Sequence, residues 1–593
     1  MRIPHIIKKN HNSEMPQRII FFDTETYETP IGKSGEKILR LELGAALFWD
    51  RANNVKEWKE FRTIPPFWNF VFSKAYKKTR LYVVAHNISF DMRVMRGFEA
   101  LKQYGWTLKK FISQGTKNIW IFKRRGQTLV FLDNMNFFMS SLENLGEGLS
   151  IHKLRMPDVN KSAVLMQYCK RDVEIMVKAW EVFIKFLTDN DLGNFAKTAA
   201  GQAMNAYRHR FMETPIYIHT NQNIVNLERA GYCGGRTECF YIGKLSGEKF
   251  YMLDVNSMYP SVMRQYEYPA KAIKYYRPTS TGNLKIFTNM LNDGYLLIAR
   301  VLVDTPEPVY PFRKNGRLTF PTGKFETIIS TRELLYALAH KHILRIREAV
   351  KYEPANLFTS YVNFFFERRM EYKKGGNAEF AFLCKIFLNS LYGKFGQRNQ
   401  KFDIIGKTRR RDGVFRYYDM DKDEEVTEKI INGFVHRSAG MVEGFESMVA
   451  IPAHITADAR MKLWNYFKAV GRDNVFYCDT DSMIVNEAGY CRAKPYLSDI
   501  IGMLSLKEVS RSVTIRGAKD YIFGKTEVIK GIKKNAEKID DNTFRQTRFE
   551  GLAGALRKGR LNEMRITETT KVLSREYKKG RILGSGIVEP FNL

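Results

Sequence analysis

Buried strands and one long helix are predicted in the first third of the chain. Apolar residues run almost unbroken through three segments, which predict strands at 19–26, 81–91 and 128–137. A helical spacing of apolar residues follows over 162–187. Strands combined with a helix in this way favour an α/β domain, and we expect that domain to end near residue 190.

Later segments predict further elements. A strand is expected to begin at residue 250 and to turn at Tyr259–Pro260, because "FYMLDVNSMYPSVM" changes from an apolar run to a proline. Helix formers and aromatic residues over 357–395 predict two helices that are broken at "KKGGN". Residues 397–437 are polar and rich in charge, which predicts a solvated, hairpin-like insertion.

The run "VFYCDTDSMIV", residues 475–485, places two aspartates inside a segment that is otherwise typical of buried strands. Asp479 and Asp481 carry like charges, and burying them together is unfavourable unless a cation compensates. One interpretation is a hairpin turn, where aspartate is common. The other is a divalent-metal site, which Asp254 at the end of another predicted strand would complete.

A second group of carboxylates belongs to the predicted α/β domain. Asp23 and Glu25 lie one residue apart on a strand and therefore share a face. Asp91 ends the second predicted strand, while Tyr168 and Asp172 lie one above the other on the predicted helix. These groups would hold two divalent ions, Mg²⁺ or Mn²⁺ because the ligands are hard oxygens, and activate water against a phosphodiester. Taken singly, "DTE" is equally well explained as a turn or a helix cap.

The net charge of the chain indicates what kind of partner it binds. The chain has 593 residues and a net charge of +32, from 95 Lys plus Arg against 63 Asp plus Glu. That balance is typical of a protein that lies along a polyanion, although a basic protein without a nucleic-acid role is an alternative. At roughly 100–200 residues per domain, we expect three to five structural units.

The sequence also bears on location. No apolar run approaches the ~18 residues of a membrane span, and residues 1–18 predict a polar tail without a hydrophobic signal core. The six cysteines form no CxxC pair, which favours a reducing compartment. We therefore expect a cytoplasmic protein that is not secreted and has no membrane partner.

The first carboxylate group resembles a known family. "DTE", "NISFD" and "YCKRD" resemble, in this order, the three motifs of a DEDD-type 3′–5′ proofreading exonuclease with an RNase H-like fold. The resemblance implies that Asp23, Glu25, Asp91 and Asp172 hold the metals and that Tyr168 orients the attacking water. It also implies that Asn87 and Phe90 contact a single-stranded primer end.

"SSLENL" is similar to a short element of this exonuclease in some polymerases. By that resemblance Ser141 and Leu142 would touch single-stranded DNA or a priming protein. A helix N-cap explains the same residues equally well.

The second carboxylate group resembles the polymerase site of family B DNA polymerases. "DVNSMYP", "KIFLNSLYGKFG" and "YCDTDS" are similar to motifs A, B and C and occur in the right order. The resemblance implies a right-hand architecture of palm, fingers and thumb. The implied metal ligands are Asp254, Val255, Asp479 and Asp481, with two ions in each active site.

Nucleotide contacts are implied on two predicted helices and beside motif A. By the resemblance, basic residues bind the triphosphate, Tyr392 lies against the nascent base pair, and Tyr259 excludes a 2′-hydroxyl. Ordinary core packing before a proline is the alternative for Tyr259. The full implied set is Tyr259, Arg369, Lys373, Lys385, Asn389 and Tyr392.

Three short elements point to one branch of the family. "YCGG" is similar to a template-contacting motif, "TADAR" to an element at the primer end, and "KDY" to one beside the primer terminus. The residues they imply as DNA contacts are Tyr232, Gly234, Gly235, Thr456, Arg460, Lys519 and Tyr521. The combination resembles the small protein-primed replicases of bacteriophages and linear plasmids. By this resemblance, the long segment between motifs A and B and the polar insertion after motif B correspond to the two terminal-protein regions of that group.

This resemblance implies a multidomain α/β and α+β chain. Its expected parts are a tail at 1–18, an exonuclease at 19–190, palm at 191–260 and 438–530, terminal-protein regions at 261–356 and 397–437, fingers at 357–396 and a thumb at 531–593.

The expected function is DNA-directed DNA synthesis with proofreading by a virus- or plasmid-encoded monomer in the host cytoplasm. Expected partners are template and primer DNA, dNTPs and a terminal priming protein. Two alternatives stay open: a family B polymerase that uses nucleic-acid primers or none, and a non-catalytic DNA-binding protein.

Overall fold

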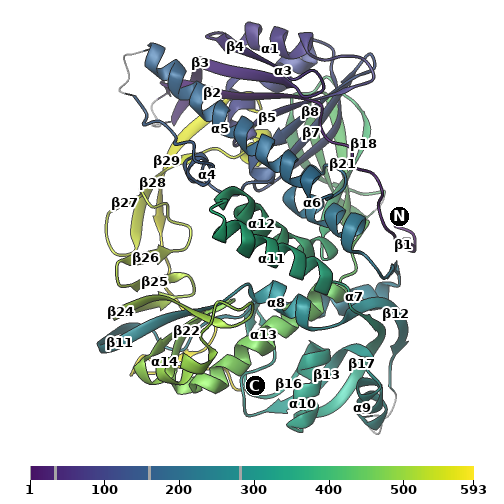
Figure 1. Ribbon diagram of the computed structural model, residues 1–593, viewed down its shortest axis with the longest axis vertical. Coiled ribbons are helices and arrows are strands. Elements are labelled where there is room, and N and C mark those ends of the chain that lie inside the picture. Colours follow the sequence, from purple (N-terminus) through teal and green to yellow (C-terminus); the bar gives the residue numbers. More distant parts are fainter. Residues whose placement is uncertain (1, 33–35, 158–161, 279–283, 422) are drawn as a thin grey trace.

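The computed structural model describes residues 2–32, 36–157, 162–278, 284–421 and 423–593. One large sheet lies at the top of Figure 1 and a second at the lower left, with a pair of helices, α11 and α12, between them. Within the described residues, no helix combines the length and the apolar character that crossing a bilayer requires.

The upper sheet has ten strands in the order β27-β28-β29-β3-β2-β5-β8-β7-β6, with β4 paired to β3. β2, β5 and β8 are parallel, and the other pairings are antiparallel. Its N-terminal strands are β2 (Arg18–Ile31), β3 (Glu36–Asp50), β4 (Val55–Phe61), β5 (Arg80–Ala85), β6 (Thr107–Gln114), β7 (Lys117–Arg124) and β8 (Gln127–Asp133).

Helices cover both faces of this sheet. The long helix α5 (Ser162–Asp189) crosses one face, where Phe21 of β2 meets Trp180 edge to face. The other face packs on α1 (Ile64–Ser73), where Phe22 meets Phe67. Because β2 is buried on both faces, its first half is a continuous apolar run, as the sequence predicts. Short helices complete the region: α2 (Ile88–Val94), α3 (Gly97–Gln103) and α4 (Leu142–Gly148).

The lower-left sheet is antiparallel, with seven strands in the order β10-β22-β23-β11-β24-β25-β26. The strands are β10 (Thr237–Cys239), β11 (Gly243–Val255), β22 (Val475–Asp479), β23 (Ser482–Asn486), β24 (Leu504–Gly517), β25 (Asp520–Phe523) and β26 (Thr526–Ile529). Three helices accompany it: α8 (Met258–Gln265), α13 (Ala450–Val470) and α14 (Glu487–Ala493).

The expected helical pair is present as α11 (Thr359–Lys374) and α12 (Ala378–Phe395), with the break at the glycines of "KKGGN".

The prediction of a turn at Tyr259–Pro260 is wrong. The turn comes earlier, at Asn256–Ser257, where Ser257 has a left-handed φ of 52°. Pro260 lies in the first turn of α8, where its missing N–H leaves no hydrogen bond unmade.

The region predicted as the first insertion forms its own sheet, in the order β12-β17-β13-β16. Its strands are β12 (Tyr268–Tyr276), β13 (Leu296–Thr305), β16 (Gly323–Ser330) and β17 (Ile343–Ala355), accompanied by α9 (Leu284–Asn292), α10 (Thr331–Ala339) and the hairpin β14 (Phe312–Lys314) with β15 (Arg317–Thr319). α6 (Ala199–Ala206) and α7 (Gln222–Gly231) precede this region.

The polar insertion is larger than predicted. Four antiparallel strands form a sheet in the order β18-β21-β20-β19 rather than a single hairpin. They are β18 (Arg398–Lys407), β19 (Gly413–Asp419), β20 (Glu424–Ile431) and β21 (Phe434–Glu443), so the sheet runs beyond residue 437. Hydrogen bonds between its strands therefore hold this sheet together, and many of its side chains are exposed.

The last part of the chain joins the two large sheets. β28 (Thr543–Phe549) and β29 (Met564–Val572), preceded by β27 (Glu537–Lys538) and separated by α15 (Leu552–Arg557), extend the upper sheet through pairing of β29 with β3. Figure 1 shows these strands on the left, between the two sheets. The chain then returns through β30 (Arg581–Ile582) and β31 (Val588–Glu589), and the Val588 N–H donates to the Phe240 carbonyl.

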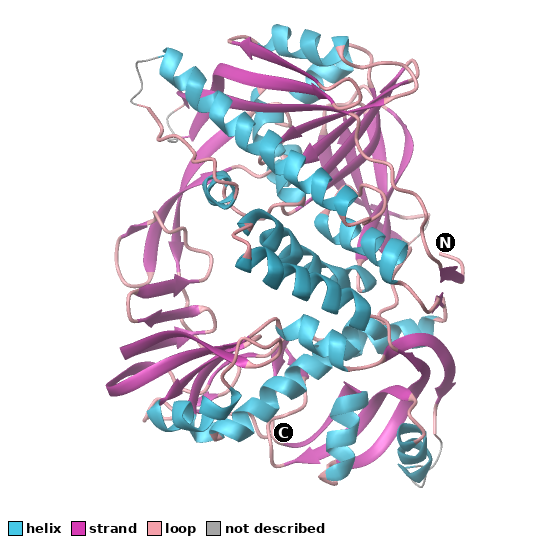
Figure 2. Ribbon diagram, in the orientation of Figure 1, coloured by secondary structure: helices cyan, strands magenta, loops and turns pink. Residues whose placement is uncertain are grey.

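The N-terminal tail is anchored, contrary to the expectation of a merely polar tail. β1 (His5–Ile7) pairs with β9 (Ile216–Ile218). The Arg2 guanidinium also donates to the carbonyls of His219 and Gly444. Figure 2 shows this short pair of strands beside the N-terminus, at the right of the molecule.

Candidate active sites

The first carboxylate group assembles between β2 and α5. The pleat of β2 directs Asp23 and Glu25 to the face that α5 covers, the same face as Phe21. The Cys169 thiol of α5 lies 3.5 Å from Asp23 Oδ2. One ligand atom from each of Asp23, Glu25 and Cys169 lies within 4.8 Å of the other two. The sequence placed the two acids on one face but gave no reason to single out Cys169.

Asp91 joins this group from a different element than expected. It lies on α2 rather than at a strand end, because β5 stops at Ala85 and Asn87 takes a left-handed φ of 67° that begins the helix. The Asp91 carboxyl is 2 % exposed, and Thr24 Oγ1 donates to it at 2.7 Å. The Asn87 N–H donates to Asp133 Oδ1 at 2.9 Å, which fixes the turn.

Asp172 and Tyr168 come from α5, one turn apart as predicted, and share a lysine that the sequence did not suggest. Lys153 pairs with Asp172 Oδ2, and its ammonium lies 4.3 Å from the centroid of the Tyr168 ring. Within the described residues, Asp172 Oδ1 is buried and has no hydrogen-bond partner. A lone lysine in a loop carries no sequence signal, so only the fold identifies Lys153.

Burial raises the pKa of every carboxyl in this group, and repulsion adds to the shift for Asp23, Glu25 and Asp91. Burial, with Asp91 and Asp172 nearby, raises the pKa of Asp23 well above its usual range. Burial raises the pKa of Glu25 to about 7 and that of Asp91 to about 8, and it also raises that of Asp172. A single lysine does not balance four acids, whereas a divalent ion on hard oxygens would. The orphaned Asp172 oxygen and the adjacent acids therefore fit Mg²⁺ or Mn²⁺.

These pKa values predict a pH-dependent stability in metal-free buffer. The folded pKa values of Glu25 and Asp91 exceed the ordinary values of 4.5 and 3.8 for these side chains. Folding therefore takes up protons between about pH 4 and pH 8, and the free energy of unfolding falls as pH rises through that window. Denaturant unfolding in EDTA at several pH values would measure the slope. Asp91→Asn, which keeps the acceptor for Thr24, should flatten it; an unchanged slope would contradict the assignment.

The four residues implied as contacts to single-stranded DNA differ in how far the structure exposes them. Asn87 is exposed, and the Phe90 ring meets Phe549 of β28 edge to face at 5.8 Å. Ser141 caps α4 by accepting from the Asn144 N–H at 3.2 Å, and Leu142 is 8 % exposed. The N-cap interpretation of "SSLENL" therefore describes this structure, and the DNA contact there stays a prediction.

The second carboxylate group lies where three strands of the lower sheet meet. Asp479 ends β22 and Asp481 precedes β23, with Thr480 between them at a φ of 64°. Asp254 on the adjacent β11 is in register with Ser482, and the Val255 N–H donates to the Asp481 carbonyl at 2.8 Å. The hairpin-turn interpretation is correct, and the same turn brings the acids together.

Electrostatics at this turn resemble those of the first group. Burial, followed by repulsion from Asp254, raises the pKa of Asp481 to about 6. Burial also raises the pKa of Asp254, and Lys507, whose Nζ is 3.3 Å from Asp254 Oδ2, opposes the shift. Lys519 Nζ is likewise 3.3 Å from Asp479 Oδ2. The sequence singled out Lys519 but not Lys507. The donor set again consists of hard oxygens that suit Mg²⁺ or Mn²⁺.

A cavity of about 570 Å³ opens beside this turn and collects most of the predicted nucleotide contacts. Its lining combines acids with cations from α11, α12 and β24. The predicted residues among those that line it are Asp254, Val255, Tyr259, Arg369, Lys373, Lys385, Asn389 and Asp481. Lys385 and Asn389 are exposed on one face of α12, as their spacing predicts. Repulsion from Arg369, together with burial, lowers the pKa of Lys373, because these two cations lie close together.

Tyr259, which lines the cavity, packs against another tyrosine and a glycine. The rings of Tyr259 and Tyr392 stack at 4.7 Å with an angle of 25° between their planes. A Cβ on Gly235 would lie 2.8 Å from Thr480 Cγ2 and 3.1 Å from the Tyr259 hydroxyl. Only glycine therefore allows the "YCGG" loop to approach the turn between the aspartates. In the same loop Gly234 is exposed, and Tyr232 is half-buried against the core.

The "TADAR" residues support this loop from below. Thr456 and Arg460 are each 3 % exposed. Arg460 Nη1 donates to the carbonyls of Cys233 and Gly234 at 2.9 and 3.1 Å, while its Nη2 pairs with Glu333 at 2.8 Å. Thr456 Oγ1 donates to the Pro452 carbonyl within α13. Their placement favours a supporting role at the primer end over direct contact.

The "KDY" residues lie beside Asp479. Lys519 has a left-handed φ of 63°, and its N–H donates to the Tyr477 hydroxyl at 3.0 Å. The Tyr521 ring meets the Tyr477 ring at 5.1 Å. This packing fixes the backbone that carries the Lys519 side chain toward the carboxylate.

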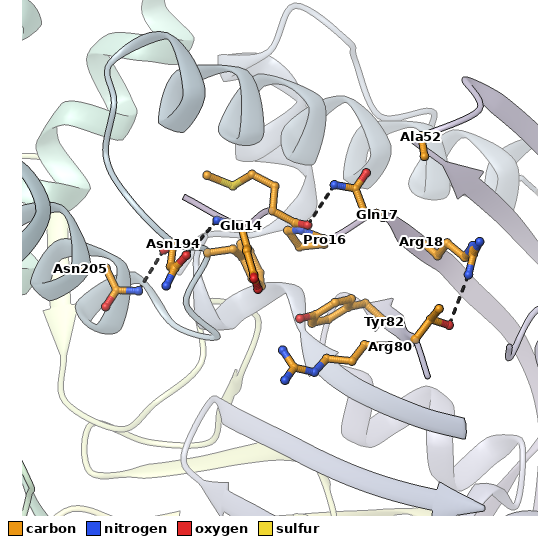
Figure 3. Close-up of a pocket in the computed structure, with 12 residues that line it drawn as sticks. Glu14, Pro16, Gln17, Arg18, Ala52, Arg80, Tyr82, Asn194 and Asn205 are labelled. Atoms are coloured by element: carbon orange, nitrogen blue, oxygen red, sulfur yellow. Dashed lines mark hydrogen bonds between the residues drawn. The ribbon is translucent and has the colours of Figure 1, made fainter. Parts of the chain in front are cut away.

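A further cavity, of about 460 Å³, holds none of the predicted residues. Figure 3 shows Arg80 and Tyr82 of β5 below Glu14, with Asn194 and Asn205 at one end. Glu14 is the one carboxylate among its lining residues. It therefore lacks the paired acids on which both candidate sites depend.

Sequence comparisons agree with this geometry. Residues 159–443 match the family described as DNA polymerase type B, organellar and viral. A probable DNA polymerase of Neurospora intermedia is 25% identical over 337 residues, which are 54% of this chain and 34% of the relative. The DNA-directed DNA polymerase of Enterobacteria phage PRD1 is 25% identical over 381 residues, 64% of this chain and 63% of the phage protein. The chain thus spans less than two thirds of these relatives' length.

The fold agrees as well. Phi29 DNA polymerase, in a complex with primer-template DNA and incoming nucleotides, superposes with a TM-score of 0.64 at 15% identity. The match covers 95% of this chain and 100% of that one. Its binary complex with primer-template DNA gives 0.61 at 16% identity. Family B polymerases depend on divalent metals, which suits both groups of acids. Over residues 159–443 the chain is therefore similar to the type B DNA polymerases of the organellar and viral kind, and its fold is similar to that of phi29 DNA polymerase.

Proposed function

We propose that the chain is a DNA-directed DNA polymerase that also removes nucleotides from a 3′ end. The observation that carries the proposal is the cavity whose lining includes both Asp254 and Asp481 and the cations Arg369, Lys373 and Lys385. Acids and cations in one cavity suit a metal-bound triphosphate, because the acids would hold the metal and the cations would bind the phosphates.

The residues of the cavity have separate tasks in this reaction. Asp254 and Asp481, assisted by Asp479, would hold two divalent ions, which when bound assist attack of a 3′-hydroxyl on the α-phosphate and neutralise the departing pyrophosphate. Lys385 and Lys373 would bind and orient the phosphates.

The stacked tyrosines bear on selectivity. Tyr259 would exclude a 2′-hydroxyl by its position beside the sugar, and Tyr392, stacked on Tyr259, would hold that ring in place. Tyr259 lines the cavity in the first turn of α8, so its ring is backed by the helix as well.

The first carboxylate group supports a 3′–5′ exonuclease. Asp23, Glu25, Asp91 and Asp172 would hold the metals that activate water, and Tyr168 would orient that water. Lys153 would position Tyr168, since its ammonium contacts the ring. Phe90 and Asn87 would receive the single strand.

Initiation on a protein is the proposed mode of priming, supported by the likeness to phi29 DNA polymerase over the whole chain. The region 261–356 would contact the priming protein, and the 398–443 sheet would face the DNA. Location in the cytoplasm of a host cell, encoded by a virus or a linear plasmid, is part of the same proposal.

Labelled dATP tests the mode of priming. With a template and a fraction containing the priming protein, label should become covalently attached to a polypeptide, because the attacking hydroxyl belongs to a side chain. Denaturing electrophoresis before and after nuclease digestion measures it, with Asp481→Asn as the control. Label found only in nucleic acid would favour a polymerase that extends nucleic-acid primers or none.

A further inference from the structure

Two catalytic carboxylates each carry a lysine as counter-ion. Lys519 Nζ lies 3.3 Å from Asp479 Oδ2, and Lys507 Nζ lies 3.3 Å from Asp254 Oδ2. Lys507 is on β24, and Lys519 is in the turn between β24 and β25. Among the described residues, no ion pair of Asp481 is present. The acids proposed to hold metal are therefore partly neutralised by the chain itself.

The two lysines belong to different cavities. Lys507 lines the cavity proposed for the nucleotide. Lys519 lines a second cavity of about 460 Å³ between the lower sheet and the returning C-terminal segment. That second cavity, here called the basic cavity, has two acids, Asp520 and Glu576, against seven cations: Arg317, Arg516, Lys519, Lys530, Arg575, Lys578 and Lys579.

The basic cavity has free capacity for an anion. Arg575 donates from Nε to Asp520 Oδ2 at 3.0 Å, yet its Nη2 is buried and has no partner among the described residues. Lys579 is used internally, because its Nζ donates to the Thr237 carbonyl at 2.8 Å. A phosphate would satisfy the remaining donors, since guanidinium and ammonium groups both bind phosphate oxygens.

The lysines are able to move while the carboxylates are fixed. The side chains of Lys507 and Lys519 are 48% and 50% exposed, against 27% for Asp254 and 25% for Asp479. Asp479 is held by Thr237 Oγ1, which donates to its Oδ1 at 2.9 Å. An exposed ion pair on a flexible stem is weak, so a nearby phosphate competes with it effectively.

We propose that Lys519 and Lys507 are resident counter-ions of the catalytic carboxylates, which phosphates of DNA in the basic cavity and of the nucleotide in the other cavity draw away. Divalent-metal affinity at the polymerase site then rises when substrate is bound. Because coupling between two ligands is reciprocal, metal also tightens DNA binding. The inference rests on the proposed polymerase function and adds a coupling to it: substrate and metal each strengthen binding of the other.

Binding of Mn²⁺ tests the proposal without any catalytic readout. Full-length protein carrying Asp23→Ala with Glu25→Ala, which removes the other metal site, is titrated with Mn²⁺ and free ion is measured by electron paramagnetic resonance. Adding Lys519→Met should tighten Mn²⁺ binding about three- to fivefold in the absence of DNA, the range expected for an exposed ion pair. Lys507→Met should act in the same direction.

Primer–template DNA distinguishes coupling from simple charge removal. In the parent protein DNA should raise Mn²⁺ affinity, after subtraction of a titration of DNA alone, and with Lys519→Met that increase should shrink. Lys578→Met is the matched control, because it lines the same cavity but pairs with Glu576. It should weaken DNA binding and leave DNA-free Mn²⁺ affinity unchanged. Inorganic phosphate at equal concentration separates a specific DNA effect from a general anion effect.

The outcomes separate this inference from the proposed function. If Lys519→Met and Lys507→Met leave the Mn²⁺ affinity unchanged, the counter-ion role is wrong. The polymerase proposal still holds in that case, provided that Asp254→Asn combined with Asp481→Asn abolishes Mn²⁺ binding. If those aspartate substitutions leave Mn²⁺ binding intact, the polymerase proposal itself fails.

Discussion

Asp481→Asn is expected to reduce nucleotide incorporation by about a thousandfold or more, because several kcal/mol of charge stabilisation by metal are lost. Asn has nearly the same volume as Asp, and the backbone contacts of residue 481 do not depend on its side chain: its carbonyl accepts from Val255 and its N–H donates to the Asp479 carbonyl. The fold of the turn should therefore survive. Single-turnover primer extension under saturating dNTP measures the effect.

The same Asp481→Asn protein carries its own internal control. Degradation of a labelled single strand should continue at the rate of the unaltered protein, since the other carboxylates lie on β2, α2 and α5. Asp473→Asn, an exposed acid shortly before β22, should leave both activities unchanged. Synthesis that persists in Asp481→Asn, or the joint loss of both activities, would refute the assignment of this turn.

Asp23→Ala combined with Glu25→Ala should reduce 3′–5′ degradation by a similar factor of about a thousand while primer extension continues. The two acids share one face of β2 and together with Asp91 and Asp172 form the proposed metal site. Burial is the main cause of the raised pKa of Asp91, and removing Glu25 relieves the repulsion that it adds, so the variant should be no less stable in EDTA. Shortening of a 5′-labelled single strand measures the loss.

Glu174→Gln is the matched control on α5. Glu174 is exposed, two residues beyond Asp172, and pairs with Arg171. It should change neither activity, and extension from a mismatched primer end should rise only in the double variant. A double variant that still degrades 3′ ends would show that the exonuclease lies elsewhere.

Short sequence patterns predicted those strands, helices and turns that depend on neighbouring residues. The apolar run of β2, the helix α5 and the break between α11 and α12 follow from spacing and glycine placement, and the structure contains all three. The turn of Asp479 and Asp481 was also predictable, because aspartates between two apolar strands demand either a turn or a cation.

Two errors share one cause. Both Asp91 and Tyr259 were expected at or near a strand end, yet both lie on helices. In each case a single residue with positive φ, Asn87 or Ser257, ends the extended backbone and starts the helix. A left-handed residue other than glycine has no clear sequence signal. The prediction therefore rested on the apolar pattern alone, and it extended each strand beyond the residue where the strand ends.

Long-range features were out of reach for a different reason. The pairing of β29 with β3, and the ion pair of Arg565 with Glu36, join residues more than five hundred positions apart. Lys153 and Lys507 acquire meaning only through the carboxylates they meet. No residue pattern within a short window records such partners, whereas the carboxylates themselves were found because two of them stand close together in each motif.

Anomalous scattering from crystals soaked in Mn²⁺ tests the central claim, that dispersed acids fold into two separate metal sites. We expect one set of peaks beside Asp254 and Asp481 and another beside Asp23 and Glu25. Peaks confined to other surfaces, with neither carboxylate group occupied, would contradict it.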